Sequence, residues 1–263
     1  MRPLWGISRH RALIRNFVKR DLQARYRGSA VGLLWPVIHP LIMLLLYTFV
    51  FSTILKVRVG AGEGTGSFAL YLFCGMLPWT AFAEALSRST GVILEHTNLI
   101  KRTIFPAEIL PVYPVISGIV NQLIGLAILF VALLLTNHRF SLIMLALPGI
   151  LLLQFAFTVG LAWIVAGTTV FIRDLGQIIG VGLTLWLFLT PIFYPPSLVP
   201  EGWGMLLSIN PMHALVEAYR SVILLGQPPR WQSLVTLGLC TLVTFLAGYR
   251  VFTRMQPAFA DVI

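Results

Sequence analysis

The sequence predicts an all-α integral membrane protein with six transmembrane helices, and two observations carry this prediction. First, 57% of the 263 residues are hydrophobic and only 11% are charged, with a mean hydropathy of +0.87. A chain of this length with so few charged residues cannot surround a single soluble core. Second, six apolar stretches each approach the roughly 20 residues that a helix needs to cross about 30 Å of hydrocarbon.

The six stretches are separated by polar or charged connections. Backbone groups cannot remain unpaired in lipid, so we expect each stretch to be a helix, kinked where a proline falls inside it. The stretches cover residues 33–55, 68–86, 109–136, 141–171, 178–194 and 234–252.

The segment before the first stretch, residues 1–30, is basic. It holds eight Arg or Lys residues and one acid, Asp21. Its apolar residues recur at helical spacing opposite the cations, which predicts an amphipathic helix in the membrane interface. No signal-peptide pattern follows, so we expect the segment to be retained. Two roles stay open, a plain membrane anchor or contact with a lipid-linked phosphate. The candidate side chains are Arg15, Lys19, Arg25 and Arg27.

A short charged insert, residues 92–106, separates the second and third stretches. Its apolar positions recur near helical spacing, and its polar positions fall elsewhere around the turn. This pattern predicts an amphipathic helix along one membrane face, ended by Pro106 because proline has no N–H to continue the ladder. From spacing alone, a helix resting on lipid headgroups and a docking surface for another protein are both open.

The distribution of Lys and Arg predicts the orientation of the chain. With the N-terminus in the cytoplasm, the inner connections hold 14 of these residues and the outer connections hold 5. The positive-inside rule therefore places both termini and the insert in the cytoplasm. Because the basic residues follow one membrane face, the net charge of +10 does not indicate nucleic-acid binding.

The connection between the fifth and sixth stretches is apolar but broken by prolines. Apolar pieces of about 10 to 14 residues are typical of re-entrant or interfacial helices. Irregular backbone at membrane depth persists only where it is buried in protein or lines a cavity. This connection could gate the outer mouth. Its candidate residues are Pro195, Pro196, Asn210 and Pro211.

Aromatic side chains are frequent within the stretches and at their ends. Interfacial belts and helix packing explain many such residues, but flat rings could also line a polar path and stack on sugars. The sequence leaves both readings open. The candidates for a path are Trp79, Phe82, Phe157, Trp163, Trp186, Phe193 and Tyr194.

Catalytic and metal-binding patterns are missing from the sequence. Cys74 and Cys240 lie in apolar stretches without a CxxC motif or a Cys/His cluster, so neither a disulfide framework nor a zinc site is supported. His213 and Glu217 share one helix face but have no third ligand nearby in sequence, so we predict no metal site. The scattered acids also argue against a membrane-embedded enzyme.

Energy for transport is not supplied by this chain in any recognisable way. A phosphate-binding loop needs GxxxxGK[ST], yet each of the three lysines follows an apolar residue. The sequence has no chain of buried acids that would couple transport to an ion gradient, and no internal repeat, so a gradient-driven carrier is disfavoured.

We expect Glu84 to pair with Arg88, four residues further along the same helix.

Six motifs follow one another along nearly the whole chain. They are RYRGSAVGLLWPVIHPL at 25–41, GMLPWTAFAEALSRS at 75–89, NLIKRTIFPAEILP at 98–111, VFIRDL at 170–175, TPIFYPPS at 190–197 and INPMHALVEAYR at 209–220. In this order they resemble the polysaccharide-export ABC transporter permeases, the membrane subunits of type-2 ABC exporters. The order is specific, whereas no single motif is decisive.

The resemblance implies a homodimer of six-span subunits that works with two copies of a cytoplasmic ABC ATPase. Residues 1–30 would be the interface helix and residues 31–263 the permease domain. Two short helices after the fifth span, at about residues 195–220, would form a periplasmic gate. The insert would be the coupling helix, so that energy arrives mechanically from the partner. This chain would bind no cofactor, because ATP and Mg²⁺ would be held by the ATPase. The residues implied in ATPase coupling are Glu95, Asn98, Leu99, Lys101 and Arg102.

The resemblance also implies the cargo and the compartment. The cargo would be a lipid-linked polysaccharide, with O-antigen on a polyprenyl diphosphate carrier favoured and capsular polysaccharide or teichoic acid as alternatives. The chain would lie in the bacterial inner membrane, in contact with membrane lipids.

Overall fold

The computed structural model describes residues 10–26, 32–54, 66–102, 105–136, 140–196 and 199–263. Over these ranges the secondary structure is helical and contains no strand. The predicted all-α fold is therefore confirmed for the described part of the chain.

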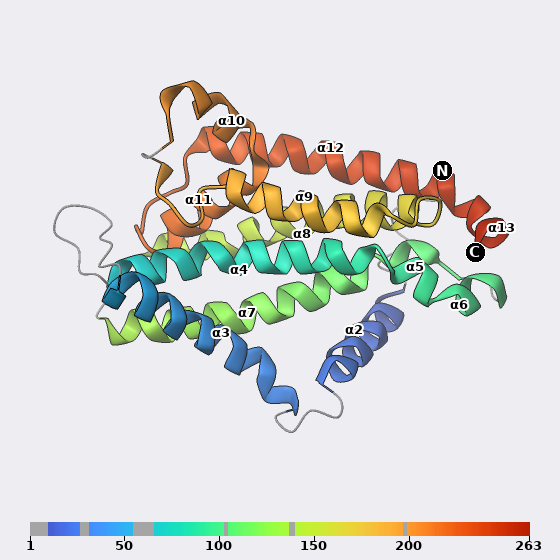
Figure 1. The fold of residues 1–263 in the computed structure, drawn as a ribbon, viewed down its shortest axis with the longest axis horizontal. Helices are drawn as coiled ribbons and strands as arrows, with labels where there is room; N and C mark the ends of the chain where they lie inside the picture. The colour runs from blue at the N-terminus through green and yellow to red at the C-terminus, as the bar shows by residue number, and fades with distance from the viewer. Residues whose placement is uncertain (1–9, 27–31, 55–65, 103–104, 137–139, 197–198) are drawn as a thin grey trace.

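Four long helices run side by side and make up the bulk of the molecule (Figure 1). They are α4 (Gly66–Ser89), α7 (Val112–Leu135), α8 (Leu147–Thr169) and α12 (Trp231–Met255). Each is long and apolar enough to cross a membrane. They correspond to the second, third, fourth and sixth apolar stretches of the sequence.

The first and fifth stretches form shorter helices. Helix α3 covers Trp35–Tyr47 and continues as a wider π-type turn over Thr48–Ile54, and helix α9 covers Leu175–Leu189. The sequence predicted that the fifth stretch reaches residue 194, but the helix ends five residues earlier. Thr190 is extended because it precedes Pro191, whose ring disfavours helical backbone at the preceding residue. The count of six spans stays a prediction.

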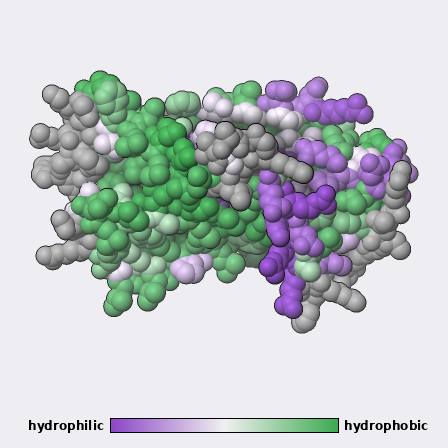
Figure 2. All heavy atoms as spheres, turned by 90° about the horizontal axis from the view of Figure 1, so that it is seen from below, coloured by the Kyte–Doolittle hydropathy of each residue, from purple (hydrophilic) through white to green (hydrophobic). Residues whose placement is uncertain are grey.

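The remaining helices gather at the two ends of the bundle (Figure 1). At one end, which we call the α2 end, lie α2 (Arg11–Tyr26), α5 (Val92–Glu95), α6 (Thr97–Arg102) and α13 (Phe259–Val262). At the opposite end, the α11 end, lie α10 (Gly204–Ile209) and α11 (Pro211–Ile223). Figure 2 shows a broad hydrophobic surface, with hydrophilic side chains gathered towards the α2 end.

Small residues let α8 and α12 approach closely. A Cβ atom at Gly160 would lie 2.6 Å from the backbone nitrogen of Phe245, and one at Gly248 would collide with the carbonyl oxygen of Gly160. Such contacts between glycines are typical of helix packing in membranes, where backbones approach through small side chains. Any larger side chain at these positions would push the two helices apart.

A buried polar network joins α7, α8 and α11. The Gln122 Nε2 donates to Gln154 Oε1 at 3.0 Å and to the Tyr219 hydroxyl at 2.9 Å. The Tyr219 hydroxyl in turn donates to Gln154 Oε1 at 2.7 Å. All three side chains are buried, so these bonds satisfy polar groups that lipid or apolar side chains could not.

Candidate functional site

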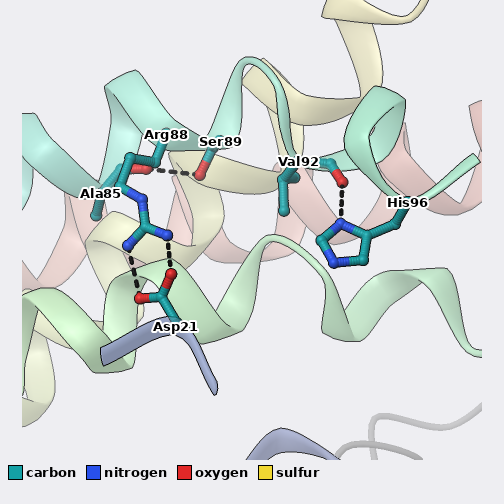
Figure 3. Close-up of polar contacts among 6 residues, drawn as sticks. All are labelled: Asp21, Ala85, Arg88, Ser89, Val92 and His96. Atoms are coloured by element: carbon teal, nitrogen blue, oxygen red, sulfur yellow. Dashed lines mark hydrogen bonds and ion pairs between the residues drawn. The ribbon is translucent and has the colours of Figure 1, made fainter. Parts of the chain in front are cut away.

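The insert forms two short helices rather than the single amphipathic helix that the sequence predicted. His96 lies between α5 and α6 with backbone angles of φ −111° and ψ 26°. Its Nδ1 lies 2.9 Å from the carbonyl oxygen of Val92, which the His96 backbone N–H would use in a continuous helix (Figure 3). That N–H instead donates to Ile93. The helix between α5 and α6 therefore breaks where the His96 imidazole takes the Val92 carbonyl oxygen that the His96 backbone N–H would otherwise bind.

Burial divides the insert into two sides. Val92 and Ile93 are buried, with 0% and 1% of their surface exposed. Glu95, Asn98 and Lys101 are exposed. The apolar side therefore holds the insert against the bundle, and the polar side is accessible to another protein.

An ion pair ties the end of α4 to α2. Arg88 Nη1 donates to Asp21 Oδ2 at 2.7 Å, and Arg88 Nη2 donates to Asp21 Oδ1 (Figure 3). This bidentate geometry, with two parallel N–H···O bonds, is the strongest arrangement that a guanidinium and a carboxylate can form. The sequence predicted Glu84 as the partner of Arg88, but this guanidinium donates both hydrogen bonds to the carboxylate of Asp21, which lies 67 positions away in the chain.

Aromatic contacts join α2 to the insert. The Phe17 ring meets the His96 ring edge-on at a centroid distance of 5.5 Å and stacks on Tyr113 at the same distance. It also contacts Phe105 at 6.0 Å. A cavity of about 760 Å³ lies beside this cluster, between α2 and the insert, and Leu99 is one of its lining residues. Helix α2 and the insert therefore share one packed unit.

The basic face of α2 is accessible, and its apolar face is packed. Ile14 is buried with 8% of its surface exposed, whereas Arg15 and Lys19 are exposed. The predicted amphipathic character of this helix is confirmed. Three other basic residues that the sequence singled out lie outside the described part of the structure. The side chains of Arg25 and Arg102 are not described, and Arg27 is not described at all.

At the α11 end, Asn210 connects α11 to the end of α9. Its Oδ1 accepts from the backbone N–H groups of Met212 at 3.0 Å and His213 at 3.3 Å, which caps α11 ahead of Pro211. The same oxygen accepts from Trp186 Nε1 at 3.0 Å. The predicted gate residue Asn210 thus holds two helices together.

An apolar cavity of about 540 Å³ adjoins these contacts and is lined by Trp186, Tyr194 and Trp203, among others. The two other predicted gate residues, Pro195 and Pro196, are half-buried beside the end of α9. Flat aromatic walls of this kind suit stacking on apolar faces, including those of sugars.

The seven aromatic candidates for a path fall into two groups. Phe82 stacks on Phe157 at 5.7 Å, and Trp186 meets Phe82 edge-on at 5.3 Å. The side chains buried inside the subunit are Trp79, Phe82, Phe157 and Trp163. The half-buried ones are Trp186, Phe193 and Tyr194. A role in lining a path stays a prediction, and the second group is the one that reaches the surface of the subunit.

A titratable pair lies on α11. Burial lowers the pKa of His213, and the neighbouring Glu217 carboxylate opposes this shift. Among the described residues, no group of three or more His, Cys, Asp or Glu side chains could hold a metal ion.

Sequence reasoning missed several residues that organise both ends. Asp21 and Phe17 on α2 and His96 in the insert were not candidates. Residues 1–30 hold eight basic residues and a single acid, Asp21, and this isolated acid was the feature of the sequence that could have indicated an ion pair. Arg220 was treated as an ordinary basic residue of an outer connection, but only 3% of its surface is exposed.

The fold and these two ends define an integral membrane subunit of a transporter. The chain belongs to the ABC-2 type transporter family, which it matches over residues 12–224.

Among known proteins, the chain is 29% identical over 259 residues to the O-antigen export system permease protein RfbA of Myxococcus xanthus, covering 98% of this chain and 97% of that protein. It is 26% identical over 245 residues to the protein of the same name from Klebsiella pneumoniae, covering 93% and 92%. It is 23% identical over 260 residues to the polysialic acid transport protein KpsM of Escherichia coli, covering 96% and 97%.

Proposed function

We propose that this chain is the membrane-spanning subunit of an ATP-driven exporter that moves polysaccharide from the cytoplasm to the periplasm. The observation that carries the proposal is similarity over nearly the full length of the chain to proteins named for O-antigen export and for polysialic acid transport. Membership of the ABC-2 family and the apolar helical bundle support it.

The favoured cargo is O-antigen on a polyprenyl diphosphate carrier. The relatives named for O-antigen export are 29% and 26% identical to the chain, whereas the relative named for polysialic acid transport is 23% identical. The last of these supports capsular polysaccharide as the second candidate. Teichoic acid is a third candidate.

In this proposal the energy for transport comes from ATP hydrolysis by a separate ATPase that docks on the insert. The exposed Glu95, Asn98 and Lys101 offer it a polar surface, while buried Val92 and Ile93 fix that surface to the bundle. The sequence carries no phosphate-binding loop, so ATP and Mg²⁺ belong to the partner. Two permease copies and two ATPase copies make up the exporter in the inner membrane, with both termini of each permease in the cytoplasm.

The contact between α2 and the insert provides a path by which movement of the docked ATPase is transmitted to the membrane helices. A push on the insert reaches α2 through Phe17 and His96, and it reaches α4 directly along the chain. The exposed cations of α2, Arg15 and Lys19, are placed to contact the phosphates of a lipid carrier or of membrane lipids. Trp186, Phe193 and Tyr194 are the aromatic residues that we assign to the path.

Complementation tests the function as a whole. The chain is expressed with and without a candidate ABC ATPase from the same genome in a bacterium that lacks its own O-antigen permease, and surface O-antigen is measured by immunoblot. We expect restored surface O-antigen only when both proteins are present. Transport into vesicles without any ATPase would favour a gradient-driven carrier instead, and sugar transfer by the purified chain alone would favour an enzyme.

A further inference from the structure

Helix α9 packs on the bundle only through half-buried side chains such as Trp186. None of its described side chains is buried within the subunit. Several of its large apolar side chains are largely exposed, among them Leu185 at 61% and Phe188 at 62%. Buried side chains that interdigitate are what normally fix a helix in one place. The polar contacts at the end of α9 therefore carry more weight than such contacts do elsewhere in the bundle.

One of these contacts comes from Arg220 in the last turn of α11. Its Nη1 donates to the carbonyl oxygen of Pro191 at 2.8 Å, and its Nη2 donates to that of Ile192 at 2.9 Å. Both carbonyls follow the end of α9, where no further helical turn supplies an N–H group. The guanidinium replaces those missing donors.

Arg220 is itself held against α4 by Tyr71. The Arg220 Nε donates to the Tyr71 carbonyl oxygen at 3.3 Å, and Nη1 donates to the Tyr71 hydroxyl at 2.8 Å. The guanidinium carbon also lies 3.5 Å from the centroid of the Tyr71 ring, within the range of a cation–π contact. One buried side chain thus links the last turn of α11, the first half of α4 and the chain just after α9.

The second contact comes from the N-terminus of α11. Asn210 Nδ2 donates to Thr190 Oγ1 at 3.1 Å and to the Leu189 carbonyl oxygen at 3.4 Å, and its Oδ1 accepts from Trp186. Asn210 and Arg220 lie near opposite ends of α11. The end of α9 is therefore held at two separated points.

We propose that Asn210 and Arg220 are positioning residues that fix the C-terminal end of α9 on α11, so that the two helices move as one unit. Where this unit serves as a gate, the inference rests on the proposed function. The gate then opens by displacement of the whole unit and not by separation of α11 from α9.

Gly75 on α4 provides an independent way to disturb Arg220. A Cβ atom at this position would lie 2.7 Å from Arg220 Nη2 and 3.1 Å from Cζ, so alanine displaces the guanidinium without removing its charge. With methionine at position 220 the Nη2 and Cζ atoms are absent, and the remaining close contact of the alanine is Val216 Cγ1 at 3.2 Å, which a shift of a few tenths of an ångström relieves. This relation predicts non-additive effects of the two substitutions.

Spin-label distances test the proposal in the purified full-length chain. Labels are placed at Leu185→Cys on α9 and Leu225→Cys directly after α11, which are 61% and 62% exposed. Cys240 is replaced by alanine, and Cys74 stays because it is buried. Samples in lipid nanodiscs contain excess unlabelled chain, so that only distances within one chain are measured by double electron–electron resonance.

We expect one narrow distance distribution for the parent protein. Its width should at least double in Arg220→Met, in Gly75→Ala and in Asn210→Ala, and Gly75→Ala should add nothing further to Arg220→Met. The matched controls are Arg230→Met, an exposed arginine after α11, and Gly238→Ala, where a Cβ meets no atom within 4 Å. Both controls should leave the width unchanged.

Unchanged widths in the three test variants would overturn the proposal. So would further broadening when Gly75→Ala is added to Arg220→Met, because crowding unrelated to the guanidinium would then be the cause. If Arg220→Met does not fold, Gly75→Ala and Asn210→Ala decide the question. The measurement involves no transport, so the proposed export function could fail while this inference stands, and the reverse.

Discussion

Asp21 forms a bidentate ion pair with Arg88. Asp21 lies on α2 and Arg88 in the last turn of α4, at the end of the bundle where the insert lies. Only 9% of the Asp21 side chain and 29% of the Arg88 side chain are exposed, so solvent screens the pair weakly. Together with the Phe17 contacts, this pair makes α2 part of the unit that a docked ATPase would move.

Reversal of the pair tests this role. Asp21→Arg and Arg88→Asp should each reduce polysaccharide export strongly and lower the stability of the subunit by about 2 to 4 kcal/mol, since each leaves two like charges in contact. The double reversal should recover a large part of both. Export is measured as surface polysaccharide, and stability by denaturant titration of the purified subunit. Arg250→Asp, at an exposed arginine on α12, is the control. A double variant no better than either single would contradict a direct interaction.

Charge reversal on the insert tests the docking surface. In the combined variant Lys101→Glu with Arg102→Glu, we expect ATPase turnover of the assembled complex to lose its dependence on the permease and export to fall at least tenfold. The reason is that the partner would meet two acids where its surface was formed against two bases. Arg173→Glu, at an exposed arginine outside the insert, is the control. Normal export together with normal ATPase coupling in the double variant would contradict docking at this surface.

Impermeant thiol reagents test the orientation. In a chain with Cys240→Ala, Lys101→Cys should react only after the inner membrane is disrupted. Leu225→Cys, which follows α11 and replaces a side chain that is 62% exposed, should react in cells with only the outer membrane permeabilised. The positive-inside distribution is the basis of this expectation. Labelling of Lys101→Cys from the periplasm would reverse the orientation and remove the insert as an ATPase site.

The sequence predicted well those features that depend on local composition. The length of apolar runs located α4, α7, α8 and α12, and the alternation of charge and apolar residues identified α2. Both signals come from neighbours in the chain. The early end of α9 was also within reach, because a residue before Pro191 is expected to be extended.

Features that depend on distant partners were not predictable in this way. No local pattern links Asp21 to Arg88 or Arg220 to Pro191, because these pairs come together only through helix packing. The break at His96 depends on one imidazole reaching a carbonyl, which periodicity does not record. Arg220 illustrates the limit most clearly, since basic residues in a connection are usually exposed, whereas this guanidinium is buried and donates to the carbonyl oxygens of Pro191 and Ile192.

The buried network of Gln122, Gln154 and Tyr219 offers a test of packing within the bundle. Tyr219→Phe removes a hydroxyl that donates to Gln154 and accepts from Gln122, so stability should fall by about 1 to 2 kcal/mol, as for hydrogen bonds between membrane helices. Unfolding in a detergent titration measures the change. Tyr194→Phe, which removes a hydroxyl bond to Phe188 at an exposed position, should cost less. An equal loss in both variants would contradict a special role for the buried network.

His213 should make the stability of the α11 end depend on pH. Because burial lowers its pKa in the folded chain, the unfolded chain binds a proton first, near its ordinary value of about 6.5. Stability is therefore fully present above that value and falls as the pH drops below it, until the folded chain is protonated as well. Glu217 favours the protonated form, whereas Arg220 and Arg230 disfavour it. Unfolding of the parent and of His213→Gln, compared between pH 7.5 and 5, should show a loss in the parent that the variant lacks. A loss of the same size in both would assign the pH dependence to other groups.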